Sequence, residues 1–70
     1  MVWLFERQGR TARLETLYLA ADNYELRFVD ADGAERVEQF GDADDLAERQ
    51  KEIQQSLTTQ GWERTGGWKL

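Results

Sequence analysis

Apolar and polar residues alternate along the first forty positions, and short polar interruptions separate the alternating runs. Alternation with a period of two is typical of β-strands, because successive side chains point to opposite faces of a sheet. The interruptions contain glycine, aspartate and asparagine, which favour turns. The pattern predicts four strands, at about residues 2–7, 11–19, 24–30 and 34–40.

The spacing of apolar residues changes after the fourth strand and becomes helical. Apolar side chains recur seven and four positions apart and would form one stripe along a helix, made by Leu46, Ile53 and Leu57. Asp42 is a favourable N-cap residue, and acidic residues follow it in the first turn, where the helix dipole favours anions. The pattern therefore predicts one helix over about residues 43–60.

The segment after the helix, residues 61–70, begins with the signals of a helix end. Gly61 would adopt left-handed geometry and direct Trp62 back over Leu57. The remaining tail could add a short strand before Gly66-Gly67.

The predicted order of elements gives a fold of the α+β class. Residues 1–70 would form a single domain, in which a four-stranded antiparallel β-meander precedes one C-terminal helix packed on one face of the sheet. A chain of this length buries little core, and small domains usually need a staple or a partner for additional stability. Because the chain has no cysteine, a disulfide is excluded, and oligomerisation is the remaining common route.

A single helix can cover only one face of a four-stranded sheet, so the residues of the two faces have different surroundings. Residues that share one side of the strands would form the core under the helix: Trp3, Phe5, Leu14, Tyr18, Leu26 and Phe28. The opposite side would carry Leu4, Leu17, Leu19 and Val29. Fully burying one such side chain contributes about 1.5–3 kcal/mol, so leaving all of them exposed would forfeit much of a small domain's stability.

Three arrangements would account for these aliphatic residues. The tail could fold over them with Trp68 and Leu70, a second copy of the chain could pack on them, or they could simply be exposed. We expect the second arrangement, because small scaffolds usually need extra burial. The interface candidates are then Leu4, Leu17, Leu19, Val29 and Trp68. The leading hypothesis is a small non-enzymatic interaction or regulatory module that forms a homodimer, with another protein as the other candidate partner.

The chain lacks most of the residue types on which catalysis depends, since it has no histidine, no cysteine and only one serine, Ser56. It therefore has no imidazole base, no thiolate nucleophile and no soft metal ligand. The run Asp42, Asp44 and Asp45 resembles a metal-binding loop, but it lacks the glycine and terminal glutamate of an EF-hand, and the helix start explains it. We expect no catalytic residue, no metal site, no cofactor and no enzymatic activity.

Charge is distributed unevenly along the chain, whose net charge is −5. Residues 21–48 contain ten acidic residues against two arginines, while the segments on either side are slightly basic. Such an acidic segment could mimic the phosphates of a nucleic acid and inhibit a basic protein, which is one alternative function. The same acidity would repel nucleic acid unless the basic residues gather on one face.

Arginines near the first three strands suggest another alternative, the binding of single-stranded nucleic acid. Sheets that bind single strands combine exposed aromatic residues with basic neighbours. The candidates for such contacts are Arg7, Arg10, Arg13 and Arg27. The aromatic residues of the strands are also the best core candidates, and they cannot both fill the core and stack on bases, which favours the core role.

The beginning of the chain has an apolar stretch of only five residues before charged residues interrupt it. That stretch is too short for a signal peptide or a membrane span. We therefore expect a cytoplasmic protein without a membrane partner.

Several short segments carry a resemblance to other proteins. The opening Val2–Arg7, the segment Ala12–Thr16 and the ending Gly66–Lys69 resemble short bacterial proteins of no established function. The order of four strands and one helix is also similar to the PC4/Whirly-like single-stranded-DNA-binding fold, whose members pair as dimers. The resemblance implies a dimer, and no residue of this chain matches a binding motif of that fold.

Overall fold

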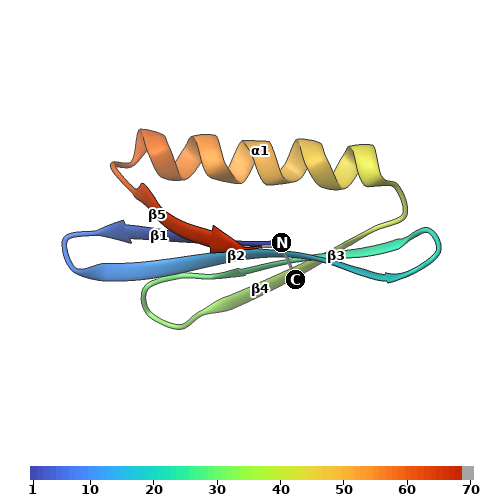
Figure 1. Cartoon of the computed structure of the whole chain (residues 1–70), viewed down its shortest axis with the longest axis horizontal. Helices are drawn as coiled ribbons and strands as arrows, with labels where there is room; N and C mark the ends of the chain where they lie inside the picture. Colours follow the sequence, from blue (N-terminus) through green and yellow to red (C-terminus); the bar gives the residue numbers. More distant parts are fainter. Residues whose placement is uncertain (69–70) are drawn as a thin grey trace.

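The computed structural model describes the backbone of residues 1–68 and the side chains of residues 1–66. Within these residues the elements are β1 (Val2–Arg7), β2 (Arg10–Ala20), β3 (Asn23–Val29), β4 (Glu35–Phe40), α1 (Ala43–Thr59) and β5 (Glu63–Trp68). The fold is α+β, with an antiparallel sheet and a single helix after the first four strands, as the sequence pattern predicts (Figure 1). The predicted bounds of the four strands and the helix agree with these bounds to within one residue.

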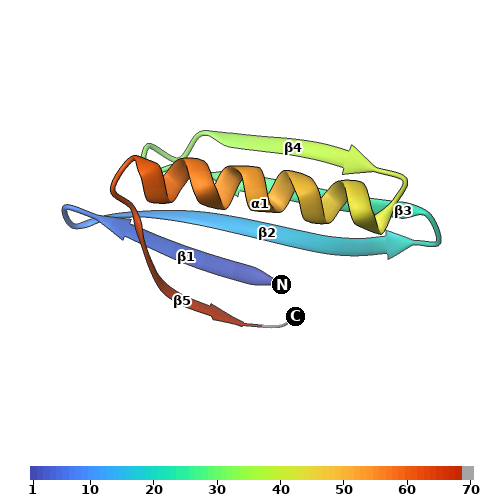
Figure 2. The ribbon, with the colours of Figure 1, turned by 90° about the horizontal axis from the view of Figure 1, so that it is seen from above.

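The sheet has the strand order β4-β3-β2-β1-β5, and every neighbouring pair is antiparallel. The predicted extra strand in the tail is present, and it pairs with β1 at the edge of the sheet (Figure 2). It continues through Gly66-Gly67 instead of ending before them, with a register shift between Leu4 and Phe5 on β1. The described backbone of the tail, up to residue 68, therefore extends the sheet at its edge, whereas Leu70 and the side chain of Trp68, which one of the three arrangements would place over the face opposite the helix, lie outside the described residues.

Two tight turns set the register of the first three strands. Gln8 and Gly9 connect β1 to β2 with positive φ values of 52° and 76°, which is the geometry of a type I′ hairpin turn. Asp22, between β2 and β3, has a φ of 56°, and aspartate is one of the residues that tolerate this left-handed region. Leu19 lies at a register shift between Tyr18 and Ala20, which is a β-bulge next to that turn.

Strand β4 pairs with β3 in an unbroken register from Val29 opposite Glu35 to Tyr24 opposite Phe40. The strand therefore has no bulge and continues to Phe40. Phe40 faces the helix, and Val37 faces the other way with 46% of its surface exposed. The alternation thus holds through β4, and its two apolar residues are three apart because they lie on opposite faces of this edge strand.

Both ends of α1 are capped as the sequence predicts. The Asp42 side chain accepts a hydrogen bond from the Asp44 backbone N–H at 2.6 Å, which satisfies one of the free donors of the first turn. At the other end Gly61 has a φ of 92°, and the Trp62 N–H donates to the Leu57 carbonyl at 2.9 Å. These bonds form a Schellman motif, which turns the chain back over the sheet.

The hydrophobic core lies between α1 and one face of the sheet. Its buried members are Trp3, Phe5, Ala12, Leu14, Leu26 and Leu57, and partly buried neighbours are Phe28, Phe40, Leu46, Ile53 and Trp62. The predicted core face is therefore confirmed except at Tyr18, which is 68% exposed. Helix α1 packs mainly against β3 and β4, and Tyr18 on the neighbouring strand β2 is left exposed. The helix lies across one face of the sheet (Figure 2).

An ion pair also joins the helix to the edge of the sheet. Arg49 Nε on α1 lies 3.1 Å from Glu38 Oε1 and 3.2 Å from Oε2 on β4, and the Arg49 Nη1 contacts Glu52 at 3.2 Å. The hydrogen bond to Glu38 raises the pKa of Arg49 above its usual value. No helix in the described residues has the length and apolarity needed to cross a membrane.

Candidate interaction surface

The face of the sheet that α1 does not cover is called the outer face here, and strand register determines its members. Leu4 on β1 lies opposite Arg13 on β2, and Arg13 lies opposite Val29 on β3. Leu17 on β2 lies opposite Glu25 on β3. Directly opposed residues point to the same side of a sheet, so these side chains all belong to the outer face.

The aliphatic residues of the outer face are partly exposed. Leu4, Leu17 and Val29 have intermediate burial, and charged side chains separate them. Leu19 lies at the β-bulge and is 49% exposed. Trp68 forms the end of β5 opposite Val2, and its side chain lies outside the described residues. The interface candidates therefore occupy four adjacent strands, and charged residues separate the aliphatic ones among them.

Charged residues between these aliphatic side chains are paired with one another. Arg13 Nε lies 3.1 Å from Glu15, and Arg27 Nη2 lies 3.0 Å from Glu25. The Nε of Arg27 is also 3.0 Å from Glu35, although its geometry gives no hydrogen bond there. Two arginines thus neutralise most of the charge of three glutamates, and the network has a net charge of −1.

Three residues of the outer face were missed in the sequence-based selection. Val2 is almost fully buried on this face, Val37 is exposed at its β4 edge, and Glu25 is 9% exposed near its centre. Strict alternation along β1 and β4 places Val2 and Val37 with the interface candidates, so that signal was available. Glu25 lies between Leu17 on β2 and Gln39 on β4, and the sequence alone does not place these residues next to it.

The four arginines proposed for nucleic-acid contacts are divided between the two faces. Register places Arg13 and Arg27 on the outer face, while Arg10 shares the helix side with Ala12 and Leu14. Arg10 contacts Asp32, and the two outer-face arginines pair with glutamates. Arg7 extends toward the end of α1. The fold therefore does not gather these arginines into one basic surface.

The acidic residues of the central segment are also spread over the molecule. Asp22 lies beside Gly41 at the start of the helix, while Asp30 and Asp32 belong to the turn between β3 and β4 at the opposite end. The Asp30 side chain accepts hydrogen bonds from the backbone N–H groups of Asp32 and Ala34, so it stabilises that turn. An extended acidic array that could imitate a nucleic-acid backbone is not formed on one face.

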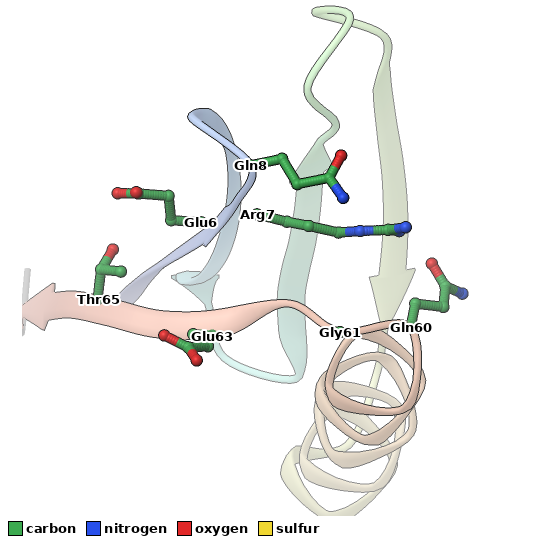
Figure 3. A pocket seen from close by; sticks show the side chains of 7 residues that line it. All are labelled: Glu6, Arg7, Gln8, Gln60, Gly61, Glu63 and Thr65. Carbon is green, nitrogen blue, oxygen red and sulfur yellow. The ribbon is translucent and has the colours of Figure 1, made fainter.

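A hollow of about 450 Å³ lies where β1, β5 and the end of α1 meet (Figure 3). Arg7 reaches toward Gln60 there, and a Cβ on Gly61 would lie 3.9 Å from the Arg7 Nε. The guanidinium is thus close to the negative end of the helix dipole, which it stabilises. Glu6 and Glu63, opposite each other on β1 and β5, do not point toward Arg7. The polar groups do not converge on one point, and within the described residues no three potential ligands are grouped to hold a metal ion.

No known protein family, curated protein or solved structure matches this chain. The similarity to the PC4/Whirly-like fold therefore stays a prediction from the order of elements.

Proposed function

We propose that this protein is a small non-enzymatic interaction module that forms a homodimer through its outer face. The observation that supports the proposal most directly is the one-sided position of α1. The helix covers one face of the sheet, and partly exposed aliphatic residues from three adjacent strands remain on the other: Leu4, Leu17 and Val29. The backbone of the fifth strand adds to the edge of the sheet.

The pairing of charges on the outer face also supports its burial in a contact. An unpaired charge is costly to remove from water, whereas a paired and hydrogen-bonded one is less so. Arg13 and Arg27 already have carboxylate partners within their own chain, at 3.0–3.1 Å. A second copy can therefore cover these residues without having to supply new partners for them.

The apolar content of the face sets the expected strength of the dimer. A partly exposed leucine or valine gains roughly 1 kcal/mol when a partner covers the rest of it, which is about half the gain of full burial. Association costs several kcal/mol of translational and rotational freedom. With only a few such residues on each copy, the net gain is roughly 4–6 kcal/mol, so we expect a dissociation constant of about 0.1–1 mM, in contrast to the tighter binding of continuous apolar interfaces.

The test is the solution mass measured by sedimentation equilibrium from low micromolar to millimolar protein. The wild-type chain should change from monomer to dimer across this range. Val29→Lys, which places a charge among the aliphatic residues, should remain monomeric, and Gln55→Lys on the exposed side of α1 should dimerise like wild type. A wild-type chain that stays monomeric up to millimolar concentration would contradict the proposal.

A further inference from the structure

Two exposed glutamates lie side by side at one end of the outer face. Glu6 belongs to this face because Phe5, its neighbour on β1, lies in the core, and register places Glu63 of β5 directly opposite Glu6. Like charges opposed in neighbouring strands destabilise a sheet, so this pair does not contribute to the stability of the fold. Neither carboxylate has an ion-pair partner within the described residues. The pair is therefore available to a cation from another molecule.

The outer face as a whole is acidic. Its described residues include two arginines and five glutamates, which give it a net charge of −3: Arg13, Arg27, Glu6, Glu15, Glu25, Glu35 and Glu63. The paired network contributes −1 of this charge, and the two exposed glutamates contribute the rest. A second copy of the chain brings the same charge to the contact, so the two copies repel each other, in agreement with the weak self-association expected above.

The aliphatic residues of the outer face cover the width of one helix. Leu4 and Val29 lie level with each other, because both are in register with Arg13 on the strand between them. Neighbouring strands are about 4.8 Å apart, so Leu4 and Val29 are about 10 Å apart, which equals the diameter of a helix. Leu17 lies four residues beyond Arg13 on β2, about 13 Å along the strands.

The two glutamates extend this strip at the end opposite Leu17. Register places Glu6 opposite Thr11, so it lies about 7 Å from the row of Leu4 and Arg13, on the side away from Leu17. The strip from Leu17 to Glu6 is therefore about 20 Å long, which matches a helix of about 13 residues. It carries aliphatic side chains along its length and two unpaired carboxylates at one end.

We propose that the outer face binds a basic amphipathic helix of another protein, which would form a third layer on the sheet. Apolar side chains of this helix pack on Leu4, Leu17 and Val29, and a lysine or arginine near its end binds between Glu6 and Glu63. The charge of such a helix is opposite to that of the face, so it gains the attraction that a second copy lacks. The inference rests on the proposed function in using the outer face as the interaction surface, and it names the partner that displaces the second copy.

The experiment is fluorescence anisotropy of a labelled amphipathic leucine–lysine peptide of about 13 residues, titrated with protein at low micromolar concentration, at which the chain is monomeric. The double variant Glu6→Gln/Glu63→Gln removes the exposed pair and keeps the shape of the side chains. Asp45→Asn/Glu48→Gln removes the same charge from exposed positions on α1 and is the matched control. A scrambled peptide of the same composition, without an apolar face, controls for attraction to net charge.

Wild type and the α1 control should bind the amphipathic peptide with similar affinity, and both should bind the scrambled peptide more weakly. Glu6→Gln/Glu63→Gln should bind about two- to tenfold more weakly than wild type, because two exposed ion pairs are lost. Val29→Lys should also lose affinity, because it places a cation under the helix. Added salt should weaken the binding of wild type more than that of the double variant. The double variant should dimerise at least as tightly as wild type, because the repulsion between copies is smaller.

The proposal is overturned if wild type does not bind the amphipathic peptide, or if the α1 control loses as much affinity as Glu6→Gln/Glu63→Gln. In the second case the binding would follow net charge alone. A double variant that loses both peptide binding and dimerisation would show damage to the face and would also overturn the role of the pair. A failure of the homodimer is distinct, because it is judged without peptide from the mass of wild type compared with Val29→Lys.

Discussion

Replacing Leu57 with alanine should destabilise the protein strongly, because Leu57 is the buried anchor of α1. It is 6% exposed, and the other apolar residues of the helix stripe, Leu46 and Ile53, are only partly buried. The substitution removes three carbon groups at about 0.8 kcal/mol each, which is roughly 2.4 kcal/mol of transfer free energy. The open groove beside Leu57 admits water, so we expect a small additional cavity term and a total loss of about 3 kcal/mol.

This loss is large relative to the stability of such a small domain. A chain of this length has an expected free energy of unfolding of roughly 3.5–10 kcal/mol. The assay is urea denaturation followed by far-ultraviolet circular dichroism and by tryptophan fluorescence, with Gln55→Ala as the exposed control on the same helix. Leu57→Ala should lower the midpoint strongly, and Gln55→Ala should change it little.

The account of helix packing is refuted if Leu57→Ala costs less than about 1 kcal/mol, or no more than Gln55→Ala. A second readout locates the effect within the molecule. Hydrogen exchange of the α1 amides should accelerate in Leu57→Ala before that of β1 and β2, because the strands retain their own ladder. Equal acceleration of hydrogen exchange in all elements would show that Leu57→Ala promotes global unfolding and not a local opening of α1.

Three further changes test local features of the fold. Asp42→Ala should cost about 0.5–2 kcal/mol in the same denaturation assay, because the Asp44 N–H loses its acceptor. Gly61→Ala should cost about 1–2 kcal/mol, since a side chain at a φ of 92° is strained, and Gly33→Ala offers a comparison at a surface turn with a φ of 86°. A double-mutant cycle on Glu38 and Arg49 should give about 0.2–1 kcal/mol, because both side chains are more than a third exposed. The pKa of Arg49 is raised in the fold, so this contribution is present at neutral pH and should be lost only as the pH rises through that raised value. A decline of the cycle energy between neutral pH and about pH 10 would contradict this reasoning.

Local signals in the sequence were sufficient to predict most of the fold. Asp42 and Gly61 mark the helix ends through capping chemistry that involves only neighbouring residues, and both are confirmed. The alternation in β1 and β3 separates the two faces correctly. The prediction of Tyr18 as a core residue was wrong, because burial on the helix side depends on where the helix lies, and α1 packs mainly against β3 and β4 while Tyr18 is on β2.

The candidate surface was less predictable than the fold, because it depends on cross-strand neighbours. The pairing of Arg27 with Glu25 and Glu35 follows from the register of β3 and β4. The sequence gives the charged residues but not their ion-pair partners. A basic patch of arginines was therefore compatible with the sequence, and only the strand register shows that these arginines are paired with carboxylates. The prediction that Leu4, Leu17 and Val29 form a self-association surface stays a prediction, supported by their position on the outer face.

The most direct test of the central claim is the mass of the wild-type chain compared with that of Val29→Lys by sedimentation equilibrium at physiological salt. We predict a reversible monomer–dimer equilibrium for wild type with a dissociation constant of about 0.1–1 mM, and a monomer for Val29→Lys at the same concentrations. A wild-type monomer throughout, or a dimer that Val29→Lys leaves unchanged, would show that the outer face is not the site of self-association.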